Sequence, residues 1–169
     1  MNRLQFRALV LGILFVAGCS ANNMETLTRD RAAVYMDVAD YMMQVVDESS
    51  ADYFLKTLAP RLKSRLDTNK NRVDMWEKYA SEDQKGAFKR LNDAIVQSRA
   101  AAIEFHQDLF ESDSLYFAAG ETIAAQNRCV KEQTRISFIL NELVAAGESC
   151  PQLSKCTTAA KDLGVLGDK

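Results

Sequence analysis

The 169-residue sequence predicts an all-α protein, an up-down-up-down bundle of four long amphipathic helices. Apolar residues recur at intervals of three and four through most of the chain, which places them on one helix face. Only two prolines and seven glycines occur, so few positions interrupt a helix. No segment alternates apolar and polar residues between hairpin turns, as strands do. We expect one domain, with the bundle at 24–147 and a short C-terminal tail at 148–169.

The first helix is predicted over residues 24–47. Its apolar positions are Leu27, Val34, Val38, Tyr41 and Val45, and the one weak step of this stripe is occupied by Arg31. The segment ends at the polar run DESSAD, where Ser49 followed by Asp52 predicts the N-terminal cap of the next helix.

The second predicted helix covers residues 51–80 and contains Pro60, which removes one backbone hydrogen bond and kinks a helix. The polar run 67–72 is rich in residues that favour turns. The apolar stripe nevertheless keeps its phase across that run, through positions 62, 66, 69, 73, 76 and 80. A turn would not preserve this phase, so we favour one long kinked helix over two helices joined at 67–72.

The third and fourth helices are delimited by local end signals. Ser81 and Gln84 have the spacing of a capping box, which predicts the start of a helix that ends near Phe110. The fourth helix is predicted over residues 115–146, and Gly147 is expected to close it, because glycine adopts the left-handed conformation that ends many helices.

The N-terminal segment has the pattern of an export signal. Arg3 and Arg7 precede an uncharged run of eleven residues, 8–18, which ends at Cys19. Basic residues, a short apolar run and small residues before a cleavage point define a secretory signal. A membrane-spanning helix needs roughly 20 apolar residues. We therefore expect residues 1–18 to be removed during export.

The sequence Val16-Ala17-Gly18-Cys19 resembles the lipobox of bacterial lipoproteins. The resemblance implies that the Cys19 sulfur receives a diacylglyceryl group, that the chain is cut before this residue, and that the new amine is acylated. Two or more acyl chains hold a protein stably at a membrane. Ser20 follows the cysteine, and by the same resemblance this favours the outer over the inner membrane, with the domain facing the periplasm.

A lipid at Cys19 would make residues 19–23 a short tether for a soluble domain. The stretch YMDVADYMMQVVDESSADYFLKTLAPRLKSRL also loosely resembles small helical bacterial lipoproteins, which implies export and a helical fold. Removing residues 1–18 takes away two of 21 basic side chains and none of 23 acidic ones, so the net charge changes from −2 to −4. This mildly acidic, mixed surface indicates no nucleic-acid partner. The expected partners are the membrane and a protein of the cell envelope.

Three further cysteines remain after lipidation of Cys19, namely Cys129, Cys150 and Cys156, in a compartment where disulfides form. Residue 129 lies about 25 Å along its helix from residue 146, so Cys150 does not easily reach back to it. We predict a Cys150–Cys156 disulfide that pins the tail. Six helical steps span about 9 Å, whereas a bridge needs Cα atoms within roughly 7 Å. The bridge therefore requires that 150–156 is not fully helical, and Cys129 is expected to be buried.

Catalytic patterns are not evident in the sequence. His106 is the single histidine, and no Glu precedes it by three residues, as in di-iron bundles. We therefore predict a non-enzymatic interaction or structural domain. Candidate docking residues are Met36, Met43, Trp76, Tyr116 and Phe117, which are otherwise core or boundary residues at helical spacing.

The pieces NMETL and FHQ resemble segments of the four-helix b-type cytochromes, a resemblance that implies axial haem ligation by Met24 and His106. In that family the histidine lies at the end of the last helix, level with the methionine. Here His106 falls at the end of the third predicted helix, which runs parallel to the first in an up-down-up-down bundle. The two residues would then lie at opposite ends. A bundle that binds haem or an apolar small molecule is therefore kept only as the alternative function.

Overall fold

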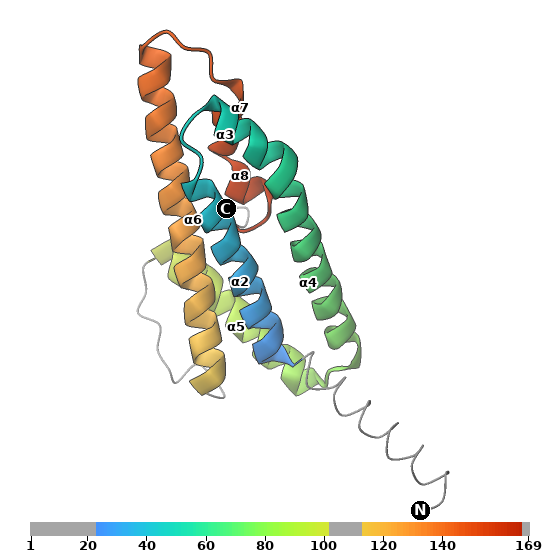
Figure 1. Ribbon diagram of the computed structural model, residues 1–169. Coiled ribbons are helices and arrows are strands. Elements are labelled where there is room, and N and C mark those ends of the chain that lie inside the picture. Colours follow the sequence, from blue (N-terminus) through green and yellow to red (C-terminus); the bar gives the residue numbers. More distant parts are fainter. Residues whose placement is uncertain (1–22, 102–112, 167–169) are drawn as a thin grey trace, which may run out of the picture.

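The computed structural model describes residues 23–101 and 113–166, and every regular element in these ranges is helical (Figure 1). The elements are α2 Met24–Met43, α3 Glu48–Tyr53, the π-helical turn η1 Phe54–Leu58, α4 Ala59–Tyr79, α5 Glu82–Ala101, α6 Asp113–Ala145, α7 Pro151–Cys156 and α8 Ala159–Asp162. The predicted all-α class is confirmed.

Helix α2 begins as predicted but ends earlier. The side chain of Asn23 accepts a hydrogen bond from the Thr26 amide at 2.7 Å, which satisfies one of the free N–H groups of the first turn. The helix ends at Met43, and Val45 then enters the core as part of the connection.

The cap of the following helix lies two residues before the predicted one. Asp47 accepts hydrogen bonds from the backbone N–H and the hydroxyl of Ser50, at 2.7 and 2.6 Å. The Ser50 hydroxyl lies 3.0 Å from the Asp47 amide, which completes a capping box. The bond from the Ser50 side chain lowers the pKa of Asp47 below its usual value, and the bond from the Ser50 amide lowers this pKa by a smaller amount. The predicted Ser49–Asp52 cap is wrong, because the N-cap residue of this helix is Asp47.

Residues 48–79 form one continuous helical run, as favoured from the stripe. The irregularity expected at Pro60 is the π turn η1, in which the Ala59 amide bonds to the Phe54 carbonyl five residues back. The polar run 67–72 is helical because Asn69 is buried and donates to the Leu27 carbonyl at 3.0 Å.

Two ion pairs show that α4 runs antiparallel to α2. Arg65 pairs with Asp37 at 2.5 Å, and Arg72, further along α4, pairs with Asp30, earlier in α2. Figure 1 shows the two helices side by side over most of their length.

The end signals of the later helices are confirmed. The Ser81 amide donates to the Gln84 side chain at 2.9 Å, and the Gln84 amide lies 3.3 Å from the Ser81 hydroxyl. At the end of α6, Gly147 has φ +86°, and the Glu148 amide bonds to the Leu143 carbonyl at 3.0 Å. This six-to-one bond is that of a Schellman motif.

Helix α6 runs parallel to α2, which contradicts the predicted up-down-up-down order. The Cys129 thiol donates to the Tyr35 carbonyl, and Arg135, later in α6, donates to the carbonyl of Met42, later in α2. In Figure 1 both helices rise in the same direction. In an up-down-up-down bundle the fourth helix would run antiparallel to the first.

The reason is the path of α5, which crosses one end of the molecule (Figure 1). Phe88, Leu91 and Ile95 of α5 pack with Ala119 of α6 in a small second core. Trp76 at the end of α4 packs edge-to-face on Phe88, with ring centroids 5.1 Å apart. Met24, at the start of α2, packs against the same core, so α6 begins near the start of α2.

The C-terminal segment is part of the main core rather than a tail. Seven of its residues are buried there: Cys150, Leu153, Cys156, Ala159, Ala160, Leu163 and Val165. Figure 1 shows α7 and α8 lying between α4 and α6. The carboxylate of Glu48 accepts from the amides of Gln152 and Leu153 at 2.7 and 3.0 Å, which holds the start of α7 against α3.

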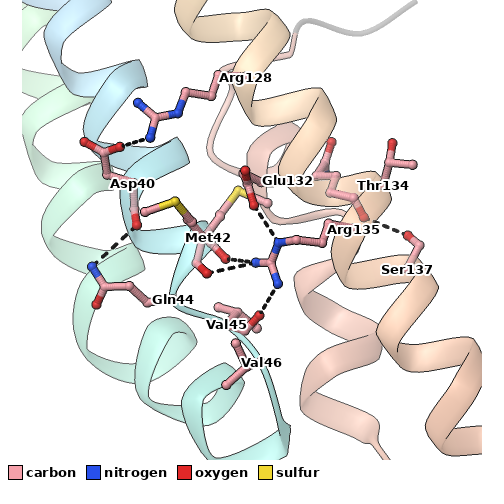
Figure 2. Close-up of polar contacts among 12 residues, drawn as sticks. Asp40, Met42, Gln44, Val45, Val46, Arg128, Glu132, Thr134, Arg135 and Ser137 are labelled. Carbon is pink, nitrogen blue, oxygen red and sulfur yellow. Dashed lines mark hydrogen bonds and ion pairs between the residues drawn. The ribbon is translucent and has the colours of Figure 1, made fainter.

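A polar network joins the end of α2 to α6 (Figure 2). Arg135 donates to the carbonyls of Met42, Met43 and Val45 at the end of the helix, where the last carbonyls lack the partner that a further helical turn would supply. Its Nε atom also pairs with the buried carboxylate of Glu132 at 2.7 Å.

Candidate functional site

The predicted Cys150–Cys156 disulfide is not formed, and both cysteines and Cys129 are free and buried. Cys150 is the N-cap of α7 and Cys156 is its last residue, so the intervening segment is helical. Six helical steps span about 9 Å, beyond the roughly 7 Å that a bridge tolerates. The condition stated for this disulfide therefore fails.

All three thiols lie in surroundings that disfavour the reactive thiolate. Burial raises the pKa of Cys129 to about 12 and that of Cys156 to about 11. Burial, together with the nearby carboxylates of Glu48 and Glu148, also raises the pKa of Cys150. These residues are apolar core positions rather than redox groups.

The structure describes only some of the other predicted site residues. Cys19 and His106 lie outside the described residues. Met24 is at the first turn of α2 and packs against the second core, as its position beside the helix start indicated.

The candidate docking residues do not form one patch. Met43, about half exposed, lies at the end of α2, whereas Phe117, also exposed, lies near the start of α6 and so at the other end of the molecule. Met36 and Trp76 are half-buried and pack against the two cores. The Tyr116 side chain lies outside the part that the structure describes.

A cleft of about 260 Å³ lies between α2, α4 and the C-terminal segment. Its lining residues are Arg31, Tyr35, Lys63, Leu66, Asp67, Asn69, Lys70, Val73, Leu163 and Gly164. Gly164 reaches this position through a turn with φ +77° at the end of α8, a conformation that favours glycine. The lining combines an apolar wall with three cations and one carboxylate.

Arg31 is the distinctive residue of this cleft. Its Nη2 atom donates to the Asn92 side chain on α5 at 3.0 Å. Its Nε atom is buried, and no hydrogen-bond acceptor among the described residues reaches it. Burial lowers the pKa of the guanidinium, an effect partly offset by the nearby Tyr35. A guanidinium remains protonated in proteins, so Arg31 carries a largely desolvated positive charge.

A second cleft of similar size, on the other side of Asn69, has a different charge balance. Its cations Arg65 and Arg72 are each paired with an aspartate of α2. In the first cleft Lys63 is paired with Asp67 at 3.3 Å, whereas no carboxylate among residues 23–101 and 113–166 pairs with Arg31. The first cleft is therefore the candidate functional site.

One feature of the sequence is a signal for this site. Arg31 lies between Leu27 and Val34 in the apolar stripe of α2, at a position where the three-and-four repeat predicts an apolar core residue. A charge at such a position is a candidate ligand-facing group. The sequence predicts a tail at residues 148–169, so it does not indicate that Leu163 and Gly164 line this cleft.

Two further properties bear on the kind of site present. Within the described ranges, His, Cys, Asp and Glu side chains form no group of three or more that is suited to hold a metal ion. None of the described helices has the length and hydropathy needed to cross a membrane.

Comparisons with protein-family models, with curated proteins and with solved structures find no match for this chain.

Proposed function

We propose that the chain is a bacterial lipoprotein whose helical domain works by binding in the cell envelope and not by catalysis. The observation that carries the proposal is the run Leu14 to Cys19, in which small residues precede a cysteine at the end of a short apolar segment. Cys19 is the proposed lipid attachment site, and the domain faces the periplasm, with the outer membrane favoured by Ser20.

The position of the folded domain supports a close tether. Helix α2 is capped by Asn23, four residues after Cys19. An extended chain spans at most about 3.5 Å per residue. The start of α2 would therefore lie within about 14 Å of the lipidated residue, and the end of the molecule crossed by α5 would face the bilayer.

The use of the buried polar groups supports binding over catalysis. Among the described residues, five polar residues are buried: Thr28, Asn69, Thr122, Gln126 and Glu132. Asn69 and Gln126 donate to backbone carbonyls of other elements, Thr28 and Thr122 donate to carbonyls four residues back in their own helices, and Glu132 pairs with Arg135. These bonds serve the fold. At the cleft, Arg31 bonds to Asn92 of α5, but its buried Nε atom has no partner among the described residues.

Metabolic labelling with palmitate tests the anchor. The wild-type chain and the control Ser20→Ala should incorporate label and partition into membranes, whereas Cys19→Ala should incorporate none. Label on the Cys19→Ala chain, or an unlabelled wild-type chain, would refute the proposal.

A further inference from the structure

We infer that the cleft between α2, α4 and the C-terminal segment binds a small organic anion, whose carboxylate or phosphate oxygens contact the Arg31 guanidinium. The inference rests on the proposed function only in that it names a ligand class for a domain proposed to work by binding. It is carried by three independent features of the cleft: an unused donor, an unbalanced charge and an apolar wall.

The unused donor is the Nε–H group of Arg31. A guanidinium has five N–H donors in a planar fork, and Asn92 takes one of them at Nη2. Buried donors in proteins almost always have a partner, because leaving one unpaired costs the desolvation of the group. Among the described residues Nε has none. An oxyanion is the acceptor that best fits two neighbouring N–H groups of an arginine.

The charge of the cleft points to the same ligand. Buried charges in proteins are normally paired with an opposite charge. The neighbours of Arg31 in the lining are the cations Lys63 and Lys70 and the carboxylate of Asp67, which is already paired with Lys63. Arg31 and Lys70 therefore leave the cleft net positive, and an anion would supply the missing counter-charge and, once the Arg31 side chain turns toward it, an acceptor for the covered Nε atom.

The remaining lining sets the size and character of the ligand. Leu66, Val73 and Leu163 contribute apolar side chains. The cleft volume of about 260 Å³ lies below the 300–1,000 Å³ typical of sites for drug-sized ligands. An anion with a short hydrocarbon chain fits this space.

A purely structural role for Arg31 makes a different prediction about stability. If the arginine served the fold alone, replacing it by an apolar residue of similar length would destabilise the chain. An unbalanced buried charge has the opposite effect, because well-packed apolar replacements of such groups are often neutral or stabilising. We expect Arg31→Met to have an unchanged or raised melting temperature without ligand.

The direct test is calorimetric titration of the lipidated mature chain, residues 19–169, in a non-ionic detergent, with butyrate and with butyl phosphate. At least one probe should bind with saturation, and butylamine should not bind. Arg31→Gln should weaken binding by about tenfold or more, since a charge-assisted hydrogen bond contributes at least that factor. The control Arg29→Gln, on an exposed arginine of the same helix, should bind like wild type.

Three results would overturn the inference: no saturable binding of either anion, equal binding by Arg31→Gln, or a marked loss of stability in Arg31→Met. Arg31-dependent binding to phosphatidylglycerol vesicles without binding of the free anions would also overturn it, in favour of a lipid headgroup. Repeating the titration with Cys19→Ala separates the two proposals. The Cys19→Ala chain, which carries no lipid, should bind the anion like wild type. A wild-type chain that binds the anion but carries no lipid would refute only the anchor, and a lipidated wild-type chain that does not bind it would refute only this site.

Discussion

The guanidinium of Arg135 on α6 closes the C-terminal end of α2, with Nη1 donating to the carbonyl oxygen of Val45 at 3.0 Å (Figure 2). The same side chain reaches the carbonyl of Met42 and the carboxylate of Glu132. The bonds to the Met42 and Val45 carbonyls join α6 to the end of α2 and to the residues that follow it, so one residue caps α2 and fixes α6 beside it.

We predict that Arg135→Met lowers the free energy of unfolding by about 2–3 kcal/mol. The substitution removes the bonds from Arg135 to the Met43 and Val45 carbonyls and leaves the buried carboxylate of Glu132 without its cation, and breaking a buried pair in this way is strongly destabilising. Arg135 is partly exposed, which places the effect below that of a fully buried pair. Urea unfolding followed by circular dichroism measures the change. Lys131→Met, on an exposed lysine of the same helix, should change it little.

Glu48 provides a similar test for the C-terminal segment. Its two carboxylate oxygens accept from the first amides of α7, and Glu48→Gln leaves only one oxygen acceptor. We expect a loss of about 1–2 kcal/mol, the range for hydrogen bonds to a charged group. Hydrogen exchange should quicken in residues 151–165 more than elsewhere. If exchange changed equally throughout the chain, the local role of Glu48 would be wrong. Glu142→Gln, at an exposed position, is the control.

The buried cysteines should resist alkylation in the folded chain at mildly alkaline pH. A free cysteine has a pKa of about 8.5, whereas burial raises that of Cys129 to about 12 and that of Cys156 to about 11. The unfolded chain then loses these protons first, so stability should fall as the pH rises through this window. Alkylation followed by peptide mapping measures reactivity. A bridged Cys150–Cys156 peptide under non-reducing conditions would contradict the helical form of α7.

Gly120 within α6 and Gly147 just after its end should respond to alanine in opposite directions. Gly147→Ala should lose about 1 kcal/mol, because φ +86° is costly for any residue with a β-carbon. Gly120→Ala should gain up to about 1 kcal/mol, because alanine is the better helix former and its β-carbon would meet no atom within 4 Å. Equal effects in thermal unfolding would show that Gly147 does not end the helix as described.

The features predicted from the sequence are those set by local chemistry. The Ser81–Gln84 capping box and the stop at Gly147 depend on residues a few positions apart. The continuous helix through residues 67–72 was also predictable from the sequence, because the apolar stripe keeps its phase across them. Asn69, which lies on that stripe, faces α2 in the structure.

The features that were missed depend on contacts distant in sequence. The direction of α6 is related to the crossing of α5. That crossing involves contacts such as Phe88 on Trp76, which form only in the folded chain and cannot be predicted from local sequence. The C-terminal segment carries apolar residues at helical spacing, Leu153, Cys156, Ala160 and Leu163, but its helices are short and the pattern alone does not say what they cover. The role of Arg31 in the cleft also could not be predicted, because it depends on neighbours that are distant in sequence.

The central claim is that lipid is attached at Cys19, and mass spectrometry of the N-terminal peptide from membrane-derived protein tests it most directly. The account predicts a peptide that begins at Cys19 and carries a diacylglyceryl group on sulfur and an acyl group on the amine. A peptide that begins at Met1, or one with an unmodified Cys19 thiol, would contradict it.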